Sequence, residues 1–230
     1  MEKRVIKNVL KLIIDLIIIS TIFFALSEHF YNSMENYFID KINSLFGTSS
    51  ISPFTTKVNL AASIICFIDV PYEIISIINK KETTFRGLQV SKYIVSVSLI
   101  LTCLVVLLVI FPITYVYTRS FAEAFKINYL GGNLFTHIVN PALFVASFIF
   151  LEDKIDLDIK TVFFSGIPVV LYVFVYAFLV FIFKTWEDFY FIKEAINYIT
   201  IFGVVAVIFI AFGLCFLFAL LLKKIKSSKA

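Results

Sequence analysis

Long apolar runs separated by short polar segments fill the chain, and their lengths predict its secondary structure. A helix needs about 20 apolar residues to cross a hydrocarbon core of about 30 Å. Six runs are candidates for such helices, and they cover residues 12–26, 54–77, 93–115, 134–151, 162–183 and 198–222. A chain in lipid must satisfy its own backbone hydrogen bonds, and the strict apolar alternation of a membrane barrel is not seen. We therefore predict an all-α polytopic membrane protein, a bundle of six transmembrane helices.

The composition strengthens this prediction. Of the 230 residues, 60% are hydrophobic and 16% are charged, whereas a soluble domain is about 45–50% apolar and about 25% charged. A chain of this size has too little interior to bury so much hydrocarbon, so the excess must face lipid. The polar segments are too short to fold separately. We expect a single integral membrane domain over residues 1–230.

Charge and cysteine usage exclude other classes of function. The net charge of +4 is modest, and the basic residues stand at segment ends rather than beside aromatic platforms, so we expect no nucleic-acid partner. Each of the three cysteines lies inside an apolar run, which argues against a disulfide framework. The sequence shows no metal-ligand spacing, so we expect neither a metal nor another cofactor.

The basic residues of the short loops predict the orientation, because such residues gather on the cytoplasmic side. With both termini inside, fourteen of the twenty basic residues are cytoplasmic, Lys11 and Lys92 among them, and six are external. The alternative for the first run is a signal peptide cleaved near Ala25-Leu26-Ser27, although Asp15 interrupts its apolar region.

Polar side chains inside a span are costly and normally face the bundle interior, so they are the first candidates for a functional site. In the second run, Thr55 and Thr56 precede Asn59 by four and three residues, and each can share a helix face with it. In the predicted topology this stripe lies near the outer end of the second helix.

A second polar stripe lies at the outer end of the fourth run. Asn133, His137 and Asn140 recur at spacings of four and three residues and fall on one helix face. Pro141 lacks the amide that would bond the carbonyl of His137, so the histidine should sit at a break in the helix. The second and fourth runs both pass from outside to inside, so the two stripes can meet at one depth.

A hydroxyl beside a histidine is the minimum for nucleophilic catalysis, because the imidazole can take the hydroxyl proton. Asn59 or Asn140 could orient the ring or donate to an oxyanion. The alternative is that these side chains only form hydrogen bonds between helices. Tyr172 and Tyr176, one turn apart in the fifth run, could line the same cavity or simply pack as aromatics. The candidate catalytic residues are thus Thr56, Thr55 and His137, and the candidate substrate-binding residues are Asn59, Asn140, Asn133, Tyr172 and Tyr176.

A third polar group, Asp15, Asp69 and Glu73, lies nearer the cytoplasmic side. Buried acids can relay protons or bind cations. We favour a simpler interpretation, in which Asp69-Val70-Pro71 ends the membrane part of the second span and an interfacial helix follows over residues 72–79.

Several segments in order point to a known family. The stretch Phe54-Thr55-Thr56-Lys57-Val58-Asn59-Leu60 is similar to a Phe-Thr-x-x-Ser-Asn-Leu signature, residues 133–141 to Asn-Leu-x-x-His-x-x-x-Pro, and Trp186-Glu187-Asp188-Phe189-Tyr190 to Trp-x-Asp-aromatic-Tyr. Between residues 54 and 190 the chain thereby resembles the bacterial Pr-six-Pr-type integral membrane proteins. These are relatives of the androgen-induced (AIG and FAR-type) membrane hydrolases. Lys57 and Phe191 depart from the pattern, the latter where a glycine is expected.

The resemblance implies a six-helix bundle in a bacterial plasma membrane. From the animal relatives it implies a threonine and histidine pair that hydrolyses fatty-acid esters of hydroxy fatty acids. On this chain the histidine is His137 and the threonine is Thr56 or Thr55. The leading hypothesis is therefore a lipid-ester hydrolase acting in the outer leaflet on membrane lipids or another amphiphilic lipid. The alternatives are a substrate-binding subunit of a transporter, like the six-span S component of vitamin transporters, and a non-catalytic structural protein.

Overall fold

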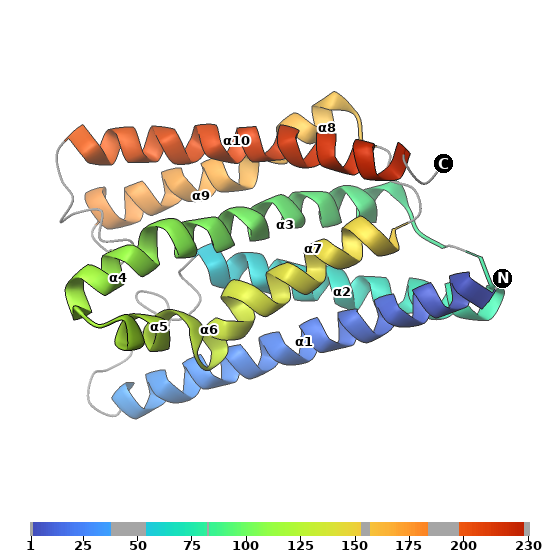
Figure 1. Cartoon of the computed structure of the whole chain (residues 1–230), viewed down its shortest axis with the longest axis horizontal. Coiled ribbons are helices and arrows are strands. Elements are labelled where there is room, and N and C mark those ends of the chain that lie inside the picture. The colour runs from blue at the N-terminus through green and yellow to red at the C-terminus, as the bar shows by residue number, and fades with distance from the viewer. Residues whose placement is uncertain (1, 38–53, 82, 153–156, 184–197, 228–230) are drawn as a thin grey trace.

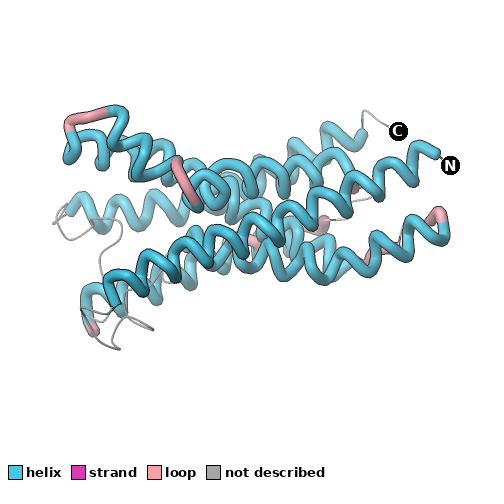
Figure 2. Tube along the Cα trace, turned by 90° about the horizontal axis from the view of Figure 1, so that it is seen from below, coloured by secondary structure: helices cyan, strands magenta, loops and turns pink. Residues whose placement is uncertain are grey.

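The computed structural model describes residues 2–37, 54–81, 83–152, 157–183 and 198–227, and the regular structure of these ranges is helical (Figure 2). Six helical segments are long and apolar enough to cross a membrane, and they comprise Lys3–Glu28, Phe54–Asn79, Arg86–Thr118, Gly132–Leu151, Ile159–Val180 and Ile208–Ile225. The predicted all-α fold with six membrane-spanning helices is confirmed.

Four helices form one group in the bundle. Helix α1 (Glu2–Tyr37) packs against α2 (Phe54–Asn79) and α7 (Asn140–Leu151), and α3 (Arg86–Val105) packs against the same two helices. The inward face of α1 explains this packing, since Ile18 and its neighbours three or four residues apart are almost fully buried. The rest of α1 presents exposed apolar side chains, as a lipid-facing surface requires.

The remaining spans pack on the other side of α3 (Figure 1). Helix α10 (Tyr198–Ser227) contacts α8 (Ile159–Phe164) and α9 (Ile167–Ala177) as well as α3. The Tyr93 ring stacks on Phe218 with centroids 5.6 Å apart, and its hydroxyl donates to the carbonyl of Cys215. Helix α1 begins and α10 ends at the same end of the bundle (Figure 1). We call this the terminal end of the bundle and the opposite one the distal end.

Two of the spans contain a π-helical turn just before a proline. These turns are η1 (Val106–Ile110), which α4 (Phe111–Thr118) continues, and η2 (Phe135–Val139) between α6 (Gly132–Leu134) and α7. Proline has no amide hydrogen and its ring crowds the carbonyl four residues earlier. In η2 the amide of Asn140 therefore bonds the carbonyl of Phe135, five residues back. The break expected near His137 takes the form of this π turn. A third π turn, η3 (Phe178–Ile182), follows α9 without a proline.

Candidate functional site

Asn59 joins the first turn of α2 to the π turn η2. Its amide nitrogen lies 2.8 Å from the carbonyl oxygen of Thr55 and 2.9 Å from that of Thr136. Asn59 is 1% exposed, and the side chains of Thr55 and Thr56 are buried too. The first turn of α2, which carries Thr55, Thr56 and Asn59, thus packs against the π turn η2, which carries His137, in the distal half of the bundle.

His137 lies in η2, and its ring is held by α5 (Phe121–Tyr129). The Nδ1 atom is 2.8 Å from the carbonyl oxygen of Asn128 at the end of that helix. A carbonyl oxygen only accepts hydrogen bonds, so Nδ1 must carry the proton, and in the neutral ring Nε2 is then the basic nitrogen. Asn133 points to the same helix, because its amide donates to the carbonyl of Ile127 over 2.8 Å.

Asn140 turns to a different neighbour. Its side-chain oxygen accepts a 2.7 Å hydrogen bond from the Thr21 hydroxyl on α1. The reason is the π turn, which adds about one residue to the helical turn and shifts the face of every later position. Asn133 and His137 therefore face α5, whereas Asn140, after the turn, faces α1.

Two buried amide atoms at this site have no hydrogen-bond partner among the described residues. They are the side-chain oxygen of Asn59 and the side-chain nitrogen of Asn140, one an acceptor and the other a donor. Buried polar atoms are normally paired, so each of these two atoms is a candidate partner for a polar group of a ligand. We call this the Asn59 site, and its residues are Thr55, Thr56, Asn59, Thr136, His137 and Asn140.

Tyr172 and Tyr176 lie on another side of α2. The ring centroids of Tyr172 and Phe54 lie 4.9 Å apart. The ammonium nitrogen of Lys57 lies 5.2 Å from the Tyr172 ring centroid. At about 100° per residue, Phe54 and Lys57 project from the face of α2 opposite to Asn59. Tyr176 packs on Tyr172, 5.9 Å away. These contacts of Tyr172 thus lie on the face of α2 opposite to Asn59.

A second polar group lies in the terminal half of the bundle. It contains six buried ionisable side chains from four helical spans, which we call the charge cluster: Lys11 and Asp15 of α1, Asp69 and Glu73 of α2, Lys92 of α3, and Glu152 directly after α7. The separate helix expected after Asp69-Val70-Pro71 is not present, because α2 continues through Pro71 to Asn79 as one helix. Both acids are buried among the helices, since Asp69 is 1% and Glu73 is 3% exposed.

The lysines of the charge cluster bridge its acids. The Lys92 ammonium pairs with Asp69 and lies 2.6 Å from Glu152, and that of Lys11 pairs with Glu73 and lies 3.2 Å from the same Glu152 oxygen. Burial favours the neutral form of the Glu152 carboxyl, but the two lysines outweigh it and hold the pKa of this group below its ordinary value.

Sequence reasoning missed this pairing because it assigned both lysines to cytoplasmic loops. Lys11 and Lys92 are instead buried in the bundle. Without these two lysines, the loops assigned to the cytoplasm still carry more basic residues than the external ones. A signal was present in the spacing, since Lys11 and Asp15, like Asp69 and Glu73, are four residues apart and share a helix face.

The chain matches no protein-family model, no curated protein and no solved structure. Among the described residues, no group of three or more histidine, cysteine or acidic side chains is placed to hold a metal ion.

Proposed function

We propose that this protein is a lipid-ester hydrolase of the bacterial plasma membrane, with Thr55 or Thr56 as the nucleophile and His137 as the general base. The observation that carries this proposal is the hydrogen bond between Nδ1 of His137 and the carbonyl of Asn128. This hydrogen bond fixes the tautomer whose Nε2 can accept a proton. In serine hydrolases a carboxylate holds the histidine in the same tautomer.

The reaction would proceed in two steps. The threonine oxygen forms a bond to the ester carbonyl carbon while its proton passes to Nε2 of His137. The carbon–oxygen bond to the alcohol then breaks, and the alcohol leaves with that proton. Water attacks the resulting acyl-threonine, again giving a proton to Nε2, which returns it to the threonine oxygen as the fatty acid departs.

The surroundings of the pair suit this chemistry. The buried amide nitrogen of Asn140 is a donor for the negative oxygen of the tetrahedral intermediate. Asn59 holds the backbone of Thr55 and that of Thr136, the neighbour of His137, on one side chain. The resemblance to the Pr-six-Pr-type family and its hydrolase relatives supports the same two residue types.

The substrate would be a membrane lipid or another amphiphilic ester. The outward faces of the spans carry exposed phenylalanine, leucine and isoleucine side chains, so an acyl chain can approach from the bilayer. With both termini in the cytoplasm, as the basic residues favour, the Asn59 site faces the outer leaflet.

Turnover of a fluorogenic fatty-acid ester by the purified chain in detergent tests the proposal. We expect His137→Ala, and either Thr55→Ala or Thr56→Ala, to lower kcat at least about 100-fold, because each removes either the nucleophile or the base that deprotonates it. The same variants should lose labelling by a fluorophosphonate. The serine variant of the reactive threonine keeps a hydroxyl and should retain part of the activity.

Thr114→Ala is the matched control. Thr114 also lies in a span, but its hydroxyl bonds the carbonyl of Ile110 on its own helix over 2.8 Å. Its loss should leave turnover unchanged. If Thr55→Ala, Thr56→Ala and His137→Ala all behaved like this control, the Asn59 site would be a packing contact and the hydrolase proposal would be wrong.

A further inference from the structure

The charge cluster holds more acids than bases, and one of its acids stands outside the ion pairs. Two ammonium groups face four carboxyl groups, so full ionisation would leave a net charge of −2. Three of the carboxyls each lie within 4.0 Å of a lysine ammonium. Asp15 is 4% exposed and forms no ion pair with any residue that the structure describes.

This imbalance favours a proton on Asp15. A net negative charge among apolar helices has little solvent to stabilise it. A proton on Asp15 lowers that charge by one and weakens no ion pair, whereas a proton on any other carboxyl of the charge cluster weakens a contact with Lys11 or Lys92. Asp15 is therefore the carboxyl on which a proton is held at least cost.

Asp15 also borders a small cavity. The cavity is about 10 Å³, close to the room that one water molecule needs. Its lining residues are Asp15, Lys92, Phe144, Ser147, Phe148 and Glu152. The Asp15 atom Oδ2 has no hydrogen-bond partner among the described residues. Four of the six lining side chains are polar, which suits a water able to pass a proton to this oxygen.

We propose that Asp15 is a proton-binding site inside the membrane, which takes up and releases a proton through this cavity. On uptake a hydronium ion gives its proton to Oδ2, an O–H bond forms, and water remains. On release the bond breaks and the proton returns to water. Asn8, one turn before Lys11 and 4% exposed, has an amide nitrogen without a partner in the described structure. Asn8 thus adds a buried polar group to α1 between the charge cluster and the terminal end.

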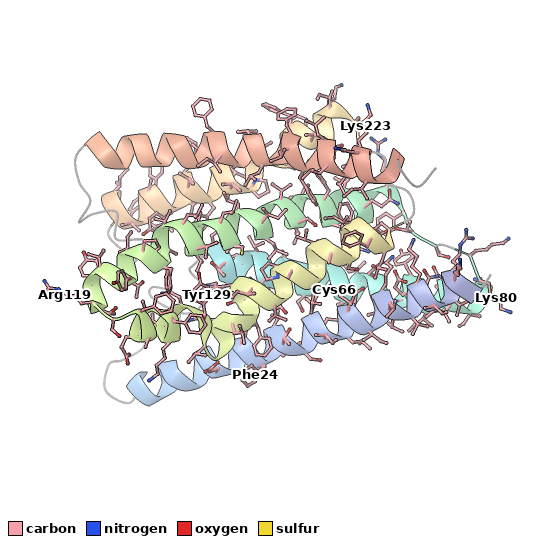
Figure 3. The ribbon with its side chains drawn as sticks, viewed as in Figure 1. Phe24, Cys66, Lys80, Arg119, Tyr129 and Lys223 are labelled. Atoms are coloured by element: carbon pink, nitrogen blue, oxygen red, sulfur yellow. The ribbon has the colours of Figure 1, made fainter. Side chains whose placement is uncertain are left out.

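Several ionisable groups face Asp15 and set its response to pH. They are Lys11 on its own helix, Cys66, Asp69 and Glu73 on α2, Lys92 on α3, and Glu152 after α7. Cys66, which contacts the Asp15 carboxyl, lies between the two ends of the bundle (Figure 3). The exchanging proton is thus well inside the span rather than at its surface.

A metal cation is the competing occupant. The ammonium groups of Lys11 and Lys92 already neutralise the neighbouring carboxylates and repel a second cation. A proton forms a neutral acid and meets no such repulsion, so the geometry favours the proton.

Infrared difference spectroscopy of the purified full chain, between neutral and alkaline buffer, tests the proposal. A protonated carboxyl has a carbonyl stretch that a carboxylate lacks, and exposed carboxyls are already ionised at neutral pH. We expect the wild type to lose one such band as the pH rises and Asp15→Asn to lack it from the start. Glu123→Gln, which removes an exposed carboxyl of α5, is the control and should keep the band. A wild type without the band, or Asp15→Asn with it, would overturn the proposal.

Thermal unfolding gives a second measurement. A carboxyl that is protonated in the folded chain and ionised in the unfolded chain makes the folded state bind more protons, so stability falls as the pH rises. Asparagine imitates the neutral acid, so Asp15→Asn should keep its Tm at neutral pH and lose part of the alkaline fall. A rise in Tm with sodium over choline at alkaline pH, absent in Asp15→Asn, would instead assign the site to a metal cation.

Discussion

Lys92→Met should lower the melting temperature by roughly 10 °C. Lys92 is 6% exposed and its ammonium contacts Asp69 and Glu152, so methionine leaves two buried carboxylates short of a cation. Removing one partner of a buried ion pair costs about 3–5 kcal/mol, and each kcal/mol moves Tm by about 2–4 °C in a chain of this size. Unfolding can be followed with a thiol-reactive dye, because Cys66 and Cys215 are buried in the folded chain.

Arg86→Met is the matched control for this effect. The Arg86 guanidinium lies 2.9 Å from the Asp158 carboxylate, but both side chains are at least half exposed. An exposed pair contributes about 0–1 kcal/mol, so Tm should hardly change. Adding Asp69→Asn to Lys92→Met removes one stranded carboxylate and should recover part of the loss. Equal Tm values for Lys92→Met and Arg86→Met would contradict the burial of the charge cluster.

The fold could be predicted from the sequence because a helix that crosses a lipid bilayer must be long and apolar. Each span needs a long apolar run, and the six runs between Leu12 and Leu222 correspond to the six membrane-spanning helical segments among the described residues. The prolines in the spans marked possible helix breaks, but they did not predict the form that each helix takes. Pro141 predicted a helix break, and the helix forms a π turn just before it. Pro71 lies within α2, which continues without interruption. The position of a proline therefore does not by itself say whether a helix forms a π turn or continues unbroken.

The sites were less predictable for a related reason. Asn59 and His137 stood out as polar residues in apolar runs, but their partners are the backbone carbonyls of Thr136 and Asn128, which leave no mark in the sequence. The tautomer of His137, which carries the hydrolase proposal, follows only from the second of these contacts.

The charge cluster was not predicted because the side chain of a lysine near the end of an apolar run can take either of two directions. It can extend to the interface, as basic side chains at helix ends commonly do, or it can turn inward to a carboxylate. Lys11 turns inward because Asp69, Glu73 and Glu152 are within its reach. Only the packing of α1 on α2 and α7 brings those acids to it.

Gly131→Ala should be the second strongly destabilising change. Gly131 has φ 59° and ψ −140°, a region that is essentially restricted to glycine and costs other residues about 1–3 kcal/mol. An added Cβ would also lie 2.9 Å from Oε2 of Glu28, whose carboxylate accepts the amide of Gly132 at the start of the helix that carries His137. A carboxylate at a helix N-terminus is favourable, so displacing it adds to the cost.

We expect Gly131→Ala to lower Tm by about 5–10 °C, from the same proportion between free energy and Tm, and to reduce ester turnover because the α1 contact to the His137 span is lost. Gly213→Ala is the control. Gly213 lies in α10 with no atom within 4 Å of the added Cβ, and alanine favours a helix by about 1 kcal/mol over glycine, so its Tm should stay or rise. Glu28→Gln keeps an acceptor for the Gly132 amide but removes the negative charge, so it should lose less than Gly131→Ala. If Gly131→Ala matched Gly213→Ala in both measurements, neither the backbone conformation at Gly131 nor the Glu28 contact would hold α1 to the His137 span.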